Sequence, residues 1–355
     1  MDSHINRKMF YDEIPFVRAI ACLMVVMVHT TARNYTGEGF TGDAAMLMNQ
    51  FSRLGTPVFA VVSAFLLTSS VIKRGFSLQR FVTSRAVKIV SPYIIWSLVY
   101  LLFIKYFHDG LIFRNAKQTF DYIVLGDAKT HLWFIAAIIQ FYIIFPLLQL
   151  IRKRELVLAL FIVSLPINYY WLGDMYPDLT PVFGKFTYII TDLTFFLNWI
   201  SYFLFGSVLA YYWEEVVQFV KKYQWLVVGI TVAVWTAIYY EISPDVVLGS
   251  ARVQNLLYIP LWVLFLILVS KYVLKGDAVY KPFRVIGDYS MGIYLLHPLI
   301  LDLILEVVPG WFTNAGGLVA AYVLAVAICT GVMKLISLMP MSTFIVPIPK
   351  PKKPV

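Results

Sequence analysis

The sequence predicts an all-α integral membrane protein, a bundle of about ten transmembrane helices with both termini in the cytoplasm. Of its 355 residues, 60% are hydrophobic and only 14% are charged, with a mean hydropathy of +0.76. A soluble domain carries roughly 25% charged residues. Apolar runs of spanning length recur along the chain. These runs do not alternate between apolar and polar residues, as the strands of a membrane barrel would.

A transmembrane helix needs about 20 predominantly apolar residues, and ten runs reach or approach that length. They lie at residues 14–32, 54–72, 89–107, 132–151, 156–172, 193–213, 225–241, 255–274, 285–308 and 316–339. The fifth and seventh are short. Residues 1–340 are therefore predicted to form one ten-helix transmembrane domain. Residues 341–355, which end in PIPKPKKPV, are predicted to form a disordered cytoplasmic tail.

The positive charges predict the orientation of the bundle. Lysine and arginine residues sort to alternate loops in a ratio of 20 to 7, and short loops rich in these residues stay on the cytoplasmic side. This placement explains the net charge of +9, so nucleic acid is not an expected partner. The first run has the length of a signal peptide. Because Arg18 interrupts it and no clear cleavage site follows, a retained helix is favoured.

The first run, FVRAIACLMVVMVHT at residues 16–30, carries an arginine near one end and a histidine near the other. Arg18 and His29 are eleven residues apart, which is three helical turns plus roughly 20°, so they share one face and lie about 16 Å apart along the axis. Ionisable residues within spans usually face the bundle interior. Two alternatives stay open: Arg18 could snorkel to the headgroups, and His29 could hydrogen-bond a neighbouring helix.

Two further histidines lie in or beside apolar runs. His131 opens the fourth run just before Trp133, where an interfacial anchor is the alternative to a reactive group. Ser290, Tyr294 and His297 lie at i, i+4 and i+7 in the ninth run and form one helical stripe. That stripe is either a polar helix-packing seam or the lining of a reaction site.

Arg80, Arg85 and Lys88 precede the third run and would share less than half of a helix circumference. They predict either a lipid-binding positive-inside loop or an anion site for a phosphate-rich cytosolic substrate. The sequence contains no Walker loop, GxGxxG, HExxH, paired CxxC or GxSxG motif. Nucleotide hydrolysis, zinc chemistry and serine hydrolysis therefore have no motif support, and no metal site is predicted. Cys22 and Cys329 lie in apolar runs and predict no disulfide.

Together these residues resemble the membrane-bound acyltransferase 3 family, in which an arginine and a histidine separated by ten residues mark the first helix. The resemblance continues through GTPVFAVVSAFLLT at 55–68, RAVKIVSPYIIW at 85–96, HLWFIAAIIQFYIIFPLL at 131–148 and SMGIYLLHPLILD at 290–302. Ala64 stands where the family commonly has glycine, and Lys88 stands where it has the second arginine of an RxxR pair. The layout most resembles the branch containing the intercellular-adhesin polysaccharide O-acyl (succinyl) transferase.

The resemblance implies a multi-pass enzyme of the bacterial cytoplasmic membrane that transfers an acetyl or succinyl group from cytosolic acyl-CoA to a glycan hydroxyl outside the cell. Acyl-CoA would be a donor substrate, with no permanently bound cofactor. His29 would be the general base, or a transient acyl carrier, and Arg18 would contact the donor. His131 and His297 would line the outer half of the same cavity. The substrate-binding residues implied are Arg80, Arg85, Lys88, Trp133, Ser290 and Tyr294.

Expected partners are membrane lipid and the glycan acceptor, and a membrane glycan synthase or a second copy of the chain are further candidates. Two other functions stay open. A polysaccharide exporter or flippase would use the same polar seam as a path. The spans contain few acidic residues to line such a path, and Asp302 and Glu306 are the clearest of them. A non-catalytic partner of a glycan synthase would not need His29. The acyl group, the acceptor, the route of transfer and the oligomeric state are not fixed by the sequence.

Overall fold

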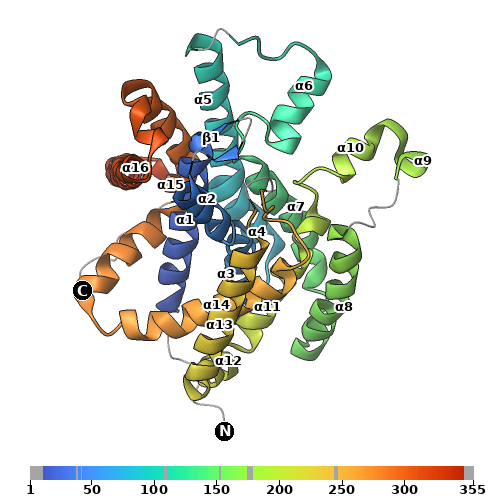
Figure 1. Cartoon of the computed structure of the whole chain (residues 1–355). Coiled ribbons are helices and arrows are strands. Elements are labelled where there is room, and N and C mark those ends of the chain that lie inside the picture. The colour runs from blue at the N-terminus through green and yellow to red at the C-terminus, as the bar shows by residue number, and fades with distance from the viewer. Residues whose placement is uncertain are drawn as a thin grey trace.

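The described part of the protein is mostly helical, and two short strands pair with each other (Figure 1). The computed structural model describes residues 11–36, 39–40, 42–107, 110–151, 153–173, 179–243 and 247–347. Long helices pack side by side, and the short helices α6, α9 and α10 lie at the periphery, away from the N-terminal end. The prediction of an all-helical membrane protein is confirmed.

The long elements are α1 (Glu13–Thr31), α3 (Gly55–Arg74), α5 (Ser91–Phe107), α7 (Trp133–Leu148), α8 (Arg154–Leu172), α11 (Ile200–Tyr211), α13 (Gln224–Glu241), α14 (Asn255–Val273), α15 (Asp277–Val307) and α16 (Ala315–Ser337). Shorter α-helices are α2 (Asp43–Ser52), α4 (Leu78–Arg85), α6 (Ala116–Phe120), α9 (Thr180–Phe183), α10 (Thr187–Ile190), α12 (Trp213–Lys222) and α17 (Ser342–Ile345).

The remaining elements are short. The 3₁₀ turns are η1 (Ala32–Asn34), η4 (Gly184–Phe186), η5 (Phe196–Asn198) and η6 (Pro309–Thr313), and the π turns are η2 (Ala86–Val90) and η3 (Asp121–Leu125). The strands β1 (Tyr35–Thr36) and β2 (Gly39–Phe40) pair antiparallel, with Tyr35 opposite Phe40.

Each of the ten predicted runs contains one of the long helices, but not all of these have spanning length. In the described part of the chain, seven helical segments are long and apolar enough to cross a membrane. An eighth is added if α12 and α13, bent by 88° at their junction, count as one span. The other two helices, α7 and α11, have only 16 and 12 residues. The turns before Trp133 and the 3₁₀ turn at Phe196–Asn198 occupy residues that the apolar pattern assigned to helix.

Helix α1 lies near the centre of the bundle, where it contacts α2, α3, α14, α15 and α16 (Figure 1). Its contact with α15 is close at one end, because a Cβ atom on Gly287 would overlap the backbone carbonyl of Pro15. Further along, Arg18 meets Ser290 and His29 meets His297. The two helices therefore run side by side in the same direction. Their facing sides hold Arg18, His29, Ser290 and His297, four of the residues singled out from the sequence.

The segment predicted to be a disordered tail is packed against the bundle as far as the structure describes it. The Ser91 hydroxyl donates to the carbonyl of Phe344 (3.0 Å), and the Trp96 indole N–H donates to the carbonyl of Ile345 (3.1 Å). Val346 is buried. The prediction failed at residues 341–347 because the backbone carbonyls of Phe344 and Ile345 accept hydrogen bonds from α5 and the side chain of Val346 is buried in the core. Residues 348–355 lie outside the described residues.

The close approach of α1 to α15 predicts the effect of Gly287→Ala. The added methyl group would collide with backbone at Pro15, which cannot rotate away, and overpacking of this kind costs about 1–3 kcal/mol. We expect a lower midpoint of thermal unfolding in detergent. Gly229→Ala is the matched control, because a Cβ there meets nothing within 4 Å and alanine favours a helix. Equal midpoints for the two variants would contradict the proposed tight contact.

Candidate active site

A cavity of about 310 Å³ opens between α1, α3, α4, α7 and α15. Its polar lining includes Arg18, Arg85, Lys88, Ser290 and Tyr294, so five of the predicted site residues meet in one place. The guanidinium of Arg18 donates to the hydroxyl of Ser290 (2.8 Å). Because a guanidinium has five N–H donors, this bond leaves others for a ligand.

A second hollow of about 290 Å³ adjoins the first, since Arg85 and Lys88 line both. Arg74 and Arg80 add two more cations, and the lining includes the serines at positions 70, 77 and 84. Among the residues that the structure describes, no acidic side chain lines either space. Four cations and three hydroxyl groups around a concave surface bind a polyanion such as a phosphate-rich molecule.

Local backbone geometry contributes to this arrangement. Lys88 lies in the π turn Ala86–Val90, between α4 and α5, and single π turns in helices are frequent at functional sites. The wider turn changes the angular spacing that an α-helix would impose on Arg85 and Lys88. The guanidinium of Arg85 also lies 5.5 Å from the ring centroid of Tyr142, a cation–π distance.

Three histidines from three separate elements form a second cluster. His29 comes from α1, His131 from the turn before α7, and His297 from α15. Their ring centroids are 5.0 Å apart for His29 and His297, 5.5 Å for His131 and His297, and 6.3 Å for His29 and His131. His131 and His297 are buried, and His29 alone keeps part of its surface exposed. The sequence pattern did not predict that the three rings would touch.

The hydrogen bonds of the cluster leave basic nitrogens available. Nδ1 of His297 lies 3.1 Å from the carbonyl of Ile293. A carbonyl only accepts, so Nδ1 donates and the neutral ring keeps its lone pair on Nε2. That nitrogen, and both ring nitrogens of His131, have no hydrogen-bond partner among the described residues. Burying an unpaired polar atom costs about 1–3 kcal/mol, and native proteins accept this cost chiefly where the atom has a function.

Tyr294 separates the cavity from the histidines. Its ring lines the cavity and lies 5.3 Å from the ring of His131 and 6.0 Å from that of His297, and its hydroxyl donates to the carbonyl of His131. In the described part of the chain, no histidine lines the cavity itself. The sequence predicted one continuous cavity from Arg85 to His29. The structure instead has a cationic cavity and a histidine cluster, with one aromatic ring between them.

Two predicted substrate-binding residues lie elsewhere. Trp133 does not line the cavity, because its ring stacks on Trp199 with centroids 5.3 Å apart. Arg80 lines the second hollow rather than the first. Among the described residues, no group of three or more histidine, cysteine or acidic side chains is arranged to hold a metal ion.

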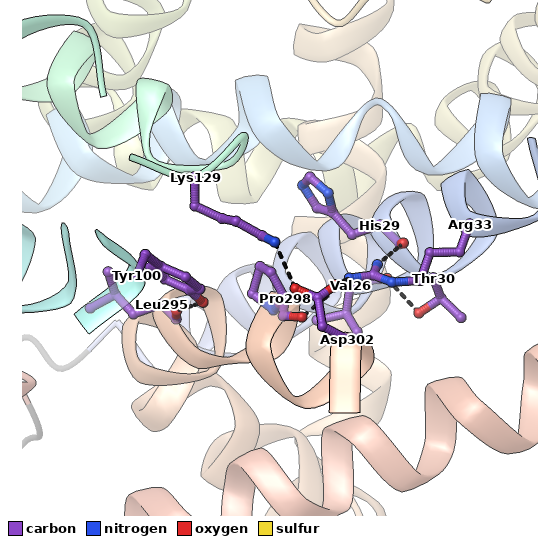
Figure 2. Close-up of polar contacts among 9 residues, drawn as sticks. All are labelled: Val26, His29, Thr30, Arg33, Tyr100, Lys129, Leu295, Pro298 and Asp302. Atoms are coloured by element: carbon purple, nitrogen blue, oxygen red, sulfur yellow. Dashed lines mark hydrogen bonds and ion pairs between the residues drawn. The ribbon is translucent and has the colours of Figure 1, made fainter. Parts of the chain in front are cut away.

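The sequence reasoning missed an ion network beyond the histidines. Asp302 pairs with both Arg33 and Lys129, each at 2.6 Å, and Figure 2 shows the two cations approaching the carboxylate from opposite sides. Arg33 also donates to the carbonyls of His29 and Pro298. The spacing offered a signal, since Arg33 follows His29 by one helical turn.

The chain is similar in sequence to known proteins. A family model described as an acyltransferase domain matches residues 11–334, and the chain belongs to this acyltransferase 3 family. It is a multi-pass membrane protein. A "probable poly-beta-1,6-N-acetyl-D-glucosamine export protein" of Staphylococcus aureus (strain MSSA476) is 26% identical over 307 residues, which is 82% of each chain. A protein of the same description from Staphylococcus epidermidis is 25% identical over 299 residues, 82% of this chain and 81% of the relative. No solved structure matches the chain.

The C-terminal segment contributes to the cavity, because Pro347 is one of the residues that line it. A chain that ends at Pro340 would lose the burial of Val346 and the bonds from Ser91 and Trp96. These losses amount to about 2–4 kcal/mol. We expect a lower unfolding midpoint in detergent. A chain that ends at Pro347 should unfold like the full chain, and equal destabilisation by both truncations would contradict this role.

Proposed function

We propose that this protein transfers an acyl group from cytosolic acyl-CoA to a hydroxyl of a glycan outside the bacterial cytoplasmic membrane. One observation carries the proposal. A cavity lined by Arg18, Arg85 and Lys88 ends one aromatic ring away from three clustered histidines. An anionic donor and a base would then lie at successive depths of one bundle.

The proposed topology has ten spans in a single domain with both termini in the cytoplasm. It counts the short helices α7 and α11 as spans, and it follows the 20 to 7 division of positive charges. Because α1 and α15 run in the same direction, an odd number of crossings must lie between them. Seven helices of the proposed set do: α3, α5, α7, α8, α11, α13 and α14. In this orientation the cationic cavity faces the cytoplasm.

The donor side follows from charge. Coenzyme A carries several phosphate charges, which Arg74, Arg80, Arg85 and Lys88 would neutralise at the inner face. Its pantetheine arm would extend past Arg18 and Ser290 along the cavity. The thioester can reach the histidines only if the ring of Tyr294 moves aside, since that ring closes the path. Arg18 and His29 are about 16 Å apart along α1, a distance that an extended arm can span.

The acceptor side requires a base. A neutral imidazole has a ring nitrogen with a free lone pair, which can accept the proton of an attacking hydroxyl. We assign this role to His29, because it keeps exposed surface on which an acceptor can approach. The imidazole removes the hydroxyl proton as the oxygen attacks the thioester carbonyl. The C–S bond then breaks, and the departing thiolate takes the proton from the imidazolium. Transfer of the acyl group to the imidazole and then to the glycan is the alternative route.

The acceptor class follows from the relatives. The relatives' description names a polymer of β-1,6-linked N-acetylglucosamine. We propose a glycan of this kind as the acceptor. The acyl group is acetyl or succinyl. A membrane glycan synthase and a second copy of the chain are proposed partners. No resident cofactor is needed for the chemistry.

Export is the second candidate, because the relatives are described as export proteins. A polysaccharide path needs a continuous polar tunnel. The lining of the cavity instead includes the aromatic rings of Tyr294 and Phe134, and Asp302 is held between two cations beside the histidine cluster. These observations favour the transferase.

The transferase is tested by His29→Ala and His29→Gln, each confirmed to insert and express normally. Neither side chain can act as the base, so we expect O-acyl groups on the purified surface glycan to be lost while export continues. Loss of export with unchanged acylation of the residual polymer would favour the exporter. If neither property changes, the non-catalytic partner is favoured. Arg18→Ala should lose acylation in the same way.

Donor recognition is tested by titrating free coenzyme A into the detergent-solubilised protein. Arg85→Gln removes a charge-assisted contact worth about 1.5–3 kcal/mol, so we expect affinity to fall roughly 10- to 100-fold. Lys281→Gln is the control, because Lys281 is exposed and lines neither hollow. Lys88→Arg keeps the charge and should retain binding. A similar loss in the Lys281 variant would mean that net charge, not the cavity, governs affinity.

A further inference from the structure

We propose that Asp302 is a positioning residue that fixes the mutual placement of the three histidines through its ion pairs with Arg33 and Lys129. This inference rests on the proposed transferase function and adds a role for residues outside the cationic cavity and the histidine cluster. Asp302 accepts from Arg33 on one oxygen and from Lys129 on the other, both at 2.6 Å (Figure 2).

Each member of this ion network lies close in sequence to one histidine. Arg33 follows His29 by four residues, Lys129 precedes His131 by two, and Asp302 follows His297 by five. The single carboxylate therefore joins the three chain segments that carry the cluster. No hydrogen bond between the histidine side chains themselves does this, since their rings meet only through ring contacts.

Two of the three segments lack part of the hydrogen bonding of a regular helix. His131 lies in turns that precede α7, where the hydroxyl of Tyr294 donates to its carbonyl and Lys129, two residues earlier, pairs with Asp302. In α15, Pro298 has no N–H and cannot complete the helical hydrogen bond one turn back. Arg33 ties together the turn that follows Pro298, because it binds both the carbonyl of Pro298 (3.2 Å) and Asp302.

The network is well placed to control geometry. The side chains of Arg33, Asp302 and Lys129 are 14%, 22% and 24% exposed, so solvent screens their attraction only in part. Without the carboxylate, two cations would face each other and repel. The resulting shift would act on ring centroids only 5.0–6.3 Å apart, and a misplacement of about 1 Å in a catalytic constellation can cost up to about 100-fold in rate.

The test is steady-state kinetics of Asp302→Asn in the full chain, with acetyl-CoA or succinyl-CoA as donor and a β-1,6-linked N-acetylglucosamine oligosaccharide as acceptor probe. We expect kcat to fall about 10- to 100-fold. KM for the acyl-CoA should stay within about twofold, because Asp302 does not line the cationic cavity proposed to bind it. Asp302→Glu keeps the charge and should recover most of kcat. Lys129→Gln removes one pair and should show a smaller loss of kcat alone.

The matched control is Glu241→Gln. It removes the ion pair of Glu241 with Arg252, whose side chains are 26% and 13% exposed, much as in the Asp302 network. That pair touches no histidine, so kcat should be kept even if stability falls. An equal loss of kcat in Glu241→Gln would reduce Asp302 to a general stabilising role and overturn the inference.

Other outcomes also decide it. Wild-type kcat in Asp302→Asn overturns the positioning role. A failure of Asp302→Glu to recover, together with a raised KM for the oligosaccharide, would make Asp302 an acceptor contact instead. The proposed function fails separately, if His29→Ala turns over both donors as well as the wild type. If His29→Ala loses activity but Asp302→Asn keeps the kcat of the wild type, only the positioning role of Asp302 is contradicted.

Discussion

The packing of α1 along α15 is the constraint on which the rest of the structure depends. Polar and charged side chains within a membrane must face the protein interior, and several of those on α1 and on the turn that follows it face α15. Arg18 binds Ser290, His29 contacts His297, and Arg33 binds Asp302. Without a close approach at Gly287, which lets the two backbones meet beside Pro15, these three contacts could not form together.

This seam divides the interior into zones of different chemistry. Cations gather where the cavity begins, the histidines lie further along, and the ring of Tyr294 stands between them. A thioester is protected from hydrolysis when water is kept from the base until the donor has bound. An aromatic wall that is displaced only by the donor arm would provide this protection. The separation of the cationic cavity from the histidines, which the sequence did not predict, would therefore serve the proposed acyl transfer.

Local periodicity accounts for what the sequence predicted well. Arg18 and His29 on α1, and Ser290, Tyr294 and His297 on α15, share stripes because both segments are regular helices. Lys129 and His131 lie in turns whose contacts depend on distant partners, so no spacing rule could bring them to Asp302. Trp133 was misplaced for the same reason, since its partner Trp199 is 66 residues away. The packed segment before Pro347 was missed because its composition resembles a tail.

The shape of the cavity bears on what passes through the protein. Pockets for small ligands measure about 300–1,000 Å³, and 310 Å³ lies at the lower end. Such a space suits the slender arm of a donor better than a chain of sugar rings. It is also closed at Tyr294, and the Asp302 network ties three segments together beyond the histidines. A transferase needs only an acyl group of a few atoms to move between these zones, so a closed wall that yields locally is compatible with transfer. Export would require the same wall and the same ion network to open widely.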